Sequence, residues 1–328
     1  MIDAKIYFER DCDRSVLQGK RIAVVGYGSQ GRAFALNLRD SGCAVTVLLR
    51  SESDSKDRAV SESVAIAELV AATGFDVIVL AFPDHEQPEF YDSYFSGDTK
   101  ARQFVLLHGS NFHFRNITFR TNHDVILVAP HGPGSDLRDN YVNGSGLSCF
   151  LAVGQDASTI AKATGLAIAA SIGAGKAGIY ETTFEDETIG DLFGEQTLLV
   201  GGLAGLTDAV FRTMVDKGIP PANAYLETIK QLRLLATMIE RFGPAGMVER
   251  VSKTAAFGSL LAMPSLFDQL FQQRLEAIFY AIKGGEFNKL LAEEAQNGFQ
   301  MYDGLLRLMK QRESQKVSEE FSNSENEQ

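Results

Sequence analysis

The sequence lacks several features that would each point to a particular class of protein. It has no excess of positive charge, because 31 lysine and arginine residues face 42 aspartate and glutamate residues, for a net charge of −11. A nucleic-acid backbone attracts basic proteins, so we expect no nucleic-acid partner. The three cysteines, Cys12, Cys43 and Cys149, lie far apart and form no C-x-x-C pair. This spacing argues against a zinc ribbon and favours a reducing compartment.

Long apolar runs are also missing. No run approaches the ~18 residues that a membrane-spanning helix needs, and the first residues show no apolar signal region. We therefore expect a cytoplasmic protein without a membrane partner. The remaining composition is ordinary: 45% of the 328 residues are hydrophobic and 22% are charged. Such a chain is long enough for about two domains with a buried core.

A glycine-rich motif follows the first apolar run. Residues 21–25 are typical of a buried parallel strand, and residues 33–38 of a helix. Between them lies the pattern G-x-G-x-x-G, formed by Gly26, Tyr27, Gly28, Ser29, Gln30 and Gly31. Gly26 permits a tight turn, Gly28 lets a pyrophosphate approach the backbone, and Gly31 brings the helix close to the strand. This strand–turn–helix arrangement predicts a dinucleotide-binding domain.

The next strand, residues 44–49, ends in a loop that bears on the choice of cofactor. An NAD site usually places an acid at this point to hold the ribose 2′-hydroxyl. Here Arg50, Ser51 and Ser53 offer a guanidinium and two hydroxyls instead. These groups suit a 2′-phosphate, so we predict NADPH as the cofactor. Glu52 also lies in this loop, and a simple solvated loop is the alternative interpretation.

Further apolar runs alternate with candidate helices or loops, at residues 76–81, 104–107, 125–129 and 150–153. This alternation predicts a doubly wound α/β domain with a parallel sheet. In such sheets ligands bind beyond the carboxyl ends of the strands. Pro83, His108, His131 and Gly134 fall at or near these ends, so we expect them at the site. For either histidine a purely structural role is the alternative.

Two acids, Asp191 and Glu195, lie four residues apart in the stretch 188–196. A helix through this stretch places both carboxylates on one face. The apolar residues around them predict that the acids lie against apolar packing, where acids usually bind a hard cation or carry protons. Gly190 and Gly194 indicate a close approach to the backbone. The alternative is a solvated turn of an amphipathic helix.

Helical spacing dominates the chain after residue 190, and no clear strand remains. The last residues are polar and acidic, which is typical of disorder. We therefore predict three parts: an NADP-binding Rossmann domain (1–181), an all-helical domain (182–312) and a disordered acidic tail (313–328).

Five motifs together resemble the ketol-acid reductoisomerase family, short-chain class I, over nearly the whole chain apart from the tail. They are the glycine motif at 26–31, His-Gly-x-Asn-x-His-Phe at 108–114, Ala-Pro-x-Gly-Pro-Gly at 129–134, Glu-Thr-Thr-Phe at 181–184, and Asp-Leu-Phe-Gly-Glu-Gln at 191–196. The resemblance implies a Rossmann domain, a helical domain with a knotted core, NADPH, two magnesium ions and a homodimer with shared active sites. The family isomerises acetolactate by alkyl migration and then reduces the product.

The resemblance also implies roles for individual residues. It implies that His108 is the active-site histidine, that Asp191 and Glu195 bind metal, that Glu227 is a metal-binding glutamate supplied by the partner subunit, and that Ser252 binds substrate. This set, with His131, forms the predicted catalytic group.

Three positions depart from the family pattern. His131 stands in place of a lysine, Ile189 where we expect a glutamate two residues before Asp191, and Gln231 in place of a second partner-subunit glutamate. The last two changes would remove negative charge on which divalent cations depend. One magnesium ion or none is therefore favoured over two. His131 would act as a proton donor instead of a permanent charge.

These departures lead to our main hypothesis, an NADPH-dependent reductase of a small 2-oxo acid or imine whose isomerase step is lost or weakened. An alternative is an authentic ketol-acid reductoisomerase, which converts acetolactate into 2,3-dihydroxy-isovalerate in branched-chain amino acid biosynthesis. A second alternative is a catalytically silent NADPH-binding partner protein.

Overall fold

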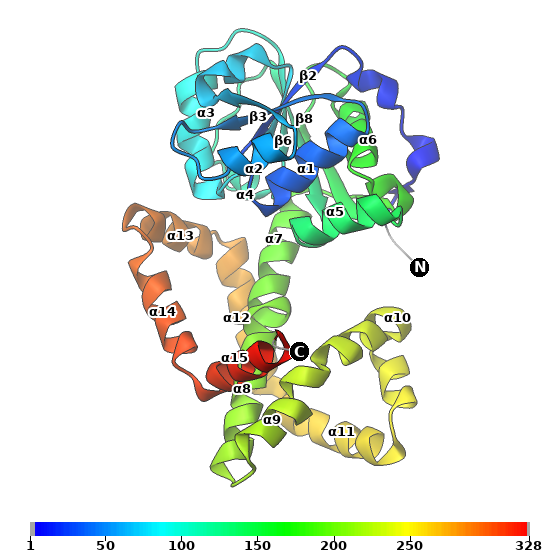
Figure 1. Cartoon of the computed structure of the whole chain (residues 1–328), viewed down its shortest axis with the longest axis vertical. Coiled ribbons are helices and arrows are strands. Elements are labelled where there is room, and N and C mark those ends of the chain that lie inside the picture. The colour runs from blue at the N-terminus through cyan, green and yellow to red at the C-terminus, as the bar shows by residue number, and fades with distance from the viewer. Residues whose placement is uncertain (1–3, 327–328) are drawn as a thin grey trace. The chain divides into compact units, whose positions relative to one another are not determined.

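The computed structural model describes residues 4–326, and the chain divides into two compact units after Gly190 (Figure 1). The boundary lies later than the predicted residue 181, because the helix that begins at Phe184 starts within the first unit.

The first unit is built on one nine-stranded sheet. Its strands are β1 (Ile6–Tyr7), β2 (Arg21–Val25), β3 (Ala44–Leu49), β4 (Ala65–Glu68), β5 (Val77–Leu80), β6 (Arg102–Leu106), β7 (His123–Pro130), β8 (Cys149–Gln155) and β9 (Ile179–Glu181). The spatial order is β1-β9-β8-β7-β6-β5-β2-β3-β4, and the strands from β4 to β7 are all parallel. This part has the strand order of a doubly wound dinucleotide-binding fold, with its switch point between β2 and β5. The predicted fold class is therefore confirmed.

Helices cover both faces of this sheet. They are α1 (Ser29–Asp40), α2 (Lys56–Ser61), α3 (Gln87–Phe95), α4 (Ser110–His113), α5 (Gly134–Asn143) and α6 (Ala161–Ser171), with short 3₁₀ turns η1 (Glu9–Asp11), η2 (Arg14–Leu17), η3 (Leu69–Gly74), η4 (Asp84–Glu86) and η5 (Ala174–Lys176). Alternate residues of β2 enter different cores: Val24 packs in the cluster that contains Phe34 of α1, and Val25 in the cluster that contains Phe95 of α3. Burial on both faces explains why the strand reads as an unbroken apolar run.

The second unit is helical, as predicted. It contains the end of α7 (Phe184–Gly194), a π-helical turn η6 (Glu195–Leu199), α8 (Gly201–Asp216), α9 (Pro221–Glu227), the 3₁₀ turn η7 (Ile229–Gln231), α10 (Leu232–Arg250), α11 (Lys253–Leu266), α12 (Gln269–Lys283), α13 (Glu286–Gln296), α14 (Gln300–Lys310) and α15 (Glu313–Asn326). The buried cluster of this unit is small and centres on Phe211, Ala224 and Tyr225.

The prediction of a disordered tail is wrong, because residues 313–326 form helix α15. Ser314 is buried and its hydroxyl donates a hydrogen bond to Asp208 Oδ1 at 2.6 Å. Phe321 stacks on Tyr225 with ring centroids 4.3 Å apart. One aromatic residue and one short polar side chain therefore anchor a helix whose composition alone is typical of disorder.

The statement that no run approaches membrane length also needs correction. The helical segment Phe184–Asp216 is long and apolar enough to cross a membrane, by length and composition alone. Only 11% of its most apolar window is buried within the chain. Such a helix can equally be covered by protein, so this feature does not by itself identify what lies against it.

Candidate active site and cofactor pocket

A cavity of about 530 Å³ lies in the first unit at the carboxyl ends of β2, β3 and β5. This volume lies within the range of small-molecule and cofactor sites. Its lining includes the glycine turn, the loop after β3 and the segment after β5, with these residues: Val25, Gly26, Tyr27, Gly28, Leu48, Leu49, Arg50, Ser53, Leu69, Ala81, Phe82, Pro83, Glu86, Glu89, Phe90, Ser93 and Tyr94. The cavity therefore lies at the switch point, where this fold binds ligands.

The glycine turn has the geometry that a phosphate-binding motif requires. Gly26 has φ +93°, and a Cβ there would lie 2.6 Å from the Ala81 carbonyl oxygen. A Cβ on Gly31 would lie 2.4 Å from the Gly26 carbonyl oxygen, so the helix approaches the turn as closely as glycine allows. Around Gly28, by contrast, no described atom lies within 4 Å of a Cβ position. The backbone at Gly28 is thus open to a ligand.

The predicted cofactor residues fall into two groups. Gly26, Tyr27, Gly28, Arg50, Ser53 and Pro83 line the cavity, whereas Ser29, Gln30, Gly31, Ser51, His108 and Gly134 are not part of its lining. Gln30 Nε2 donates to the Gly132 carbonyl oxygen at 2.8 Å, and a Cβ on Gly134 would lie 2.1 Å from the Ser29 carbonyl oxygen. These contacts attach the start of α1 to the loop after β7.

The loop after β3 is fixed by its neighbours. Arg50 Nη1 lies 3.4 Å from Glu86 Oε2, and the Arg50 side chain remains 73% exposed. Ser51 donates from its hydroxyl to Glu68 Oε1 at 3.2 Å and accepts on its carbonyl oxygen from Lys56 Nζ at 2.7 Å. The guanidinium is therefore accessible to a phosphate, since an exposed ion pair with one carboxylate is weak.

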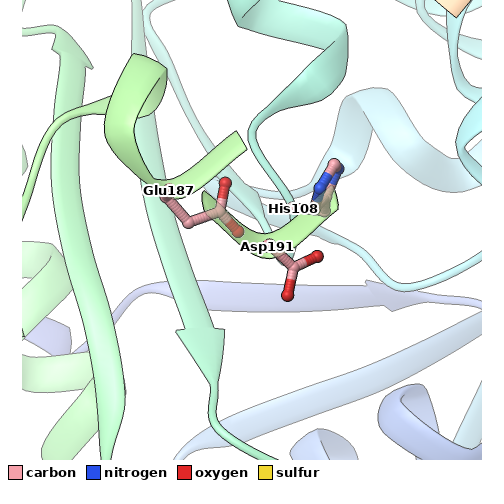
Figure 2. A group of neighbouring side chains, drawn as sticks. All are labelled: His108, Glu187 and Asp191. Atoms are coloured by element: carbon pink, nitrogen blue, oxygen red, sulfur yellow. The ribbon is translucent and has the colours of Figure 1, made fainter. Parts of the chain in front are cut away.

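A second constellation forms around helix α7. Among residues 4–326, one group of three side chains with metal-ligand chemistry brings its ligand atoms within 4.8 Å of one another: His108, Glu187 and Asp191 (Figure 2). Glu187 and Asp191 lie one turn apart on α7, and His108 follows β6. Glu187 is buried, and its Oε2 accepts a hydrogen bond from the Gly109 backbone amide at 2.8 Å.

Glu187 was not among the predicted site residues, and it occupies a different helical position from Ile189. We expected a glutamate two residues before Asp191, but residues two apart on a helix point to opposite sides. Ile189 is buried, whereas Glu187, four residues before Asp191, lies on the same face of the helix as Asp191. Glu187 therefore offers a carboxylate beside Asp191, while Ile189 still departs from the family pattern. Extending the four-residue spacing of Asp191 and Glu195 back by one turn would have found it.

His108 is oriented by the turn that follows it. Its Nδ1 accepts a hydrogen bond from the Ser110 backbone amide at 3.3 Å. A neutral imidazole that accepts on Nδ1 carries its proton on Nε2. This tautomer makes His108 a hydrogen-bond donor at Nε2, which suits contact with a ligand oxygen better than metal ligation.

His131 lies at the end of β7, the strand beside β6, and so at the same edge of the sheet as His108. Its Nδ1 lies 2.9 Å from the Ser148 hydroxyl, and its ring meets the edge of Phe150 with centroids 4.3 Å apart. Tyr180 is the next ring, at 6.1 Å. At the position where the family has a lysine, this chain thus places an exposed imidazole that contacts Ser148 and Phe150.

The other predicted catalytic residues are not gathered at this cluster. Glu195 is exposed at the start of the π-helical turn η6, and Glu227 accepts from Gln231 Nε2 at 3.2 Å. Ser252 caps helix α11, accepting from the Ala255 amide at 3.2 Å. Within the described chain, then, neither Glu227 nor Ser252 belongs to the group around Glu187.

The surroundings of Asp191 and Glu195 also differ from the prediction. We expected apolar packing around both carboxylates, but both residues are exposed in the single chain. Their apolar neighbours Leu198 and Leu199 are 67% and 63% exposed. A Cβ on Gly190 would meet no described atom within 4 Å, so no close approach to the backbone occurs there within the chain.

The sheet order, the glycine turn and the cavity together are typical of a dinucleotide-binding protein. Comparison with known proteins narrows this class. Residues 16–178 match the acetohydroxy acid isomeroreductase NADPH-binding domain, and residues 184–325 match the ketol-acid reductoisomerase C-terminal domain. The chain belongs to the ketol-acid reductoisomerase family. The predictions of an NADP-dependent oxidoreductase and of NADPH as its cofactor are confirmed by these matches.

Individual relatives agree with this assignment. The chain is 41% identical over 320 residues to a ketol-acid reductoisomerase (NADP(+)) from Pyrobaculum arsenaticum, covering 97% of this chain and 98% of the relative. It is 40% identical to the corresponding protein of Pyrobaculum neutrophilum, with the same coverage. Among solved structures, an NADH-preferring ketol-acid reductoisomerase from an uncultured archaeon matches with a TM-score of 0.93 and 32% identity, over 97% of this chain and 98% of that one.

Proposed function

We propose that the protein is an authentic ketol-acid reductoisomerase, which converts acetolactate into 2,3-dihydroxy-isovalerate for branched-chain amino acid synthesis. The observation that carries this proposal is the buried carboxylate of Glu187, which lies with Asp191 and His108 in one group. Our main hypothesis of a lost isomerase step depended on two missing charges, at Ile189 and Gln231, whereas Glu187 offers a carboxylate beside Asp191 that this hypothesis did not count. We place the enzyme in the cytoplasm, in keeping with the free thiols Cys12, Cys43 and Cys149.

The donor groups fit magnesium. Glu187 and Asp191 offer carboxylate oxygens, the ligands that this ion prefers, and Glu195 lies one further turn along the same helical segment. We assign metal binding to these three residues and to Glu227 of a second copy. Bound magnesium would supply Lewis-acid polarisation of the substrate oxygens.

The chain's own residues supply binding and proton transfer. His108 Nε2 donates a hydrogen bond to a substrate oxygen, and Ser252 of a second copy binds the substrate carboxylate. His131, which contacts the Ser148 hydroxyl, donates a proton to the oxygen of the carbonyl group that the cofactor reduces. For the cofactor, Arg50, Ser51 and Ser53 receive the 2′-phosphate. The turn at Gly28, with the start of helix α1, receives the pyrophosphate.

A homodimer accounts for the apolar helices of the second unit. Many large apolar side chains of this unit are exposed in the single chain: Leu198, Leu199, Val200, Leu203, Leu206, Val210, Leu226, Leu234, Ile239, Phe242, Phe257, Leu260, Leu261, Met263, Leu266, Phe267 and Leu270. Exposed apolar surface on this scale is typical of a protein interface. We propose that a second copy, and not a membrane, covers the segment Phe184–Asp216. Light scattering of the purified protein without detergent should give twice the chain mass of 35.8 kDa; a stable monomer, or a requirement for detergent, would contradict this assignment.

Substrate assays separate this function from its alternatives. NADPH oxidation is measured with acetolactate and, separately, with 3-hydroxy-3-methyl-2-oxobutyrate, which requires only the reduction. We expect turnover of both, magnesium dependence with acetolactate, and loss of that turnover in EDTA. Rescue of a branched-chain auxotroph provides the cellular test. Turnover of the second substrate alone would refute the proposal.

The reduction-only enzyme remains the second candidate, because the departures from the family pattern at His131, Ile189 and Gln231 stand. His131 replaces a lysine, and Gln231 places an amide beside Glu227. This candidate predicts reduction of 2-oxo acids or imines without efficient magnesium-dependent turnover of acetolactate. A catalytically silent NADPH-binding protein would oxidise NADPH with none of these substrates.

A further inference from the structure

We propose that Glu62 is a positioning residue that couples the loop for the 2′-phosphate to the turn for the pyrophosphate, and so sets the preference for NADPH over NADH. Glu62 lies just after helix α2 and does not line the cofactor cavity. Its effect on a cofactor is therefore indirect. This inference deepens the cofactor part of the proposed function.

The carboxylate of Glu62 joins two parts of the phosphate-binding turn. Its Oε2 accepts a hydrogen bond from the Tyr27 hydroxyl at 2.7 Å, and both oxygens accept from Arg32 Nε at 2.9 Å. Tyr27 is the buried middle residue of the glycine turn, and Arg32 lies in the first turn of α1. The Glu62 side chain thus contacts both the glycine turn and helix α1, which begins directly after that turn.

The backbone around Glu62 is fixed as well. Its carbonyl oxygen accepts a hydrogen bond from Arg39 Nη1 on α1, and it closes helix α2 as the C-cap residue. The next residue, Ser63, has φ +57°, which a non-glycine residue adopts only where its surroundings hold it. Helix α2 therefore has one end fastened to α1 and to the glycine turn.

The other end of α2 carries the loop that receives the 2′-phosphate. Lys56, the first residue of α2, donates from Nζ to the Ser51 carbonyl oxygen at 2.7 Å, and its amide donates to the Ser53 carbonyl oxygen at 3.2 Å. Because α2 is a single short helix, displacement of Glu62 at one end would move Ser51 and Ser53 at the other. NADH and NADPH differ only in the phosphate that this loop receives.

The contact is charged at neutral pH. The hydrogen bonds from Arg32 hold the pKa of the Glu62 carboxyl below its usual range, although partial burial opposes this. Burial, together with the adjoining carboxylate of Glu62, raises the pKa of Tyr27, so the phenol stays protonated and donates. A neutral amide at position 62 would keep the shape but lose the charge that orients both partners.

The test compares Glu62→Gln with the unchanged enzyme by measuring dissociation constants for NADPH and NADH through cofactor fluorescence. We expect NADPH binding to weaken about tenfold, the scale of one hydrogen bond to a charged group. NADH binding should change less than about twofold, because NADH lacks the phosphate that the loop after β3 receives. This assay needs no turnover, so its result is independent of whether acetolactate is the substrate. Equal weakening for both cofactors, or no weakening, would overturn the proposal.

A matched control separates positioning from general stability. Glu181 accepts from the Tyr7 hydroxyl at 2.7 Å and from Lys162 Nζ at 2.6 Å, so it also joins a tyrosine to a cation in the first unit. It does not line the cavity. Glu181→Gln should lower the melting temperature by an amount similar to Glu62→Gln and leave the ratio of the two dissociation constants unchanged. A changed ratio in this control would count against the proposal.

A milder variant covers the case in which Glu62→Gln fails to fold. Tyr27→Phe removes one hydrogen bond to Glu62 and keeps the ion pair with Arg32. It should weaken NADPH binding more than NADH binding, by a smaller factor than Glu62→Gln. Identical dissociation-constant ratios in Tyr27→Phe and the unchanged protein would refute the coupling.

Discussion

A single methyl group at Gly109 should disable the acid cluster. This residue follows His108 and lies against α7, where a Cβ would come within 2.3 Å of Thr188 Oγ1, 2.7 Å of Glu187 Oε2 and 3.0 Å of the Phe184 carbonyl oxygen. The Phe184 carbonyl oxygen belongs to the backbone, so it cannot rotate away from the added methyl group. Gly109→Ala must therefore push α7 outward and lengthen the hydrogen bond from the Gly109 amide to Glu187, now 2.8 Å.

The size of the effect follows from two contributions. Forcing a methyl group into a filled contact costs about 1–3 kcal/mol. Losing a hydrogen bond to a charged acceptor costs about 1.5–3 kcal/mol more. A loss of about 3 kcal/mol in the free energy of unfolding lowers the melting temperature of a domain of this size by roughly 6–12 °C. The same energy, lost from the transition state, slows the reaction by roughly 100-fold.

Calorimetry and a magnesium titration of acetolactate turnover measure both effects. Gly97→Ala is the control, since a Cβ there meets no described atom within 4 Å and Gly97 has no positive φ. We expect Gly109→Ala to lower both the melting temperature and the rate, and Gly97→Ala to leave both near their original values. A Gly109→Ala protein with unchanged stability and unchanged magnesium dependence would refute the packing argument.

Three other predictions concern acid stability, the last helix and the cofactor. Burial lowers the pKa of His123 below its ordinary value of 6.5. The stability that depends on neutral His123 is therefore fully present above pH 6.5 and is lost as the pH falls through the lowered pKa. His123→Phe should flatten the acid side of a plot of melting temperature against pH. Phe321→Ala removes the ring stacked on Tyr225 and should cost about 2 kcal/mol in denaturant unfolding of the second unit, whereas no change would show that α15 is not anchored there. Arg50→Gln should raise the KM for NADPH about tenfold and leave that for NADH nearly unchanged, and equal shifts would argue against a phosphate contact.

Local signals were enough to predict the first half of the fold. The glycine motif between an apolar run and a helix predicted the turn at Gly26, because its φ of +93° is available to glycine at little cost. The strands buried on both faces were equally clear from their apolar runs. Strand β4, by contrast, is partly exposed and contains Glu68, so its composition did not distinguish it from a loop.

The second unit was harder, because its helices are interrupted where the sequence gives weak signals. Residues 222–242 contain no glycine or proline, yet the helix is interrupted at Thr228, which has ψ −79°. Gly243, followed by Pro244, kinks α10 with φ +72° and does not end it. At the site, the sequence singled out Asp191 and Glu195 but not Glu187, whose place beside Asp191 follows from one further turn of the same helix.

The helices of the second unit expose many apolar side chains in the single chain, which affects how the protein is produced and stored. In the homodimer that we propose, a newly made chain exposes these apolar helices until it binds a second copy, so dimer formation competes with aggregation. Specific activity should then fall when the protein is diluted. A subunit in which Glu227 is replaced should impair the active site of the other subunit of the proposed dimer.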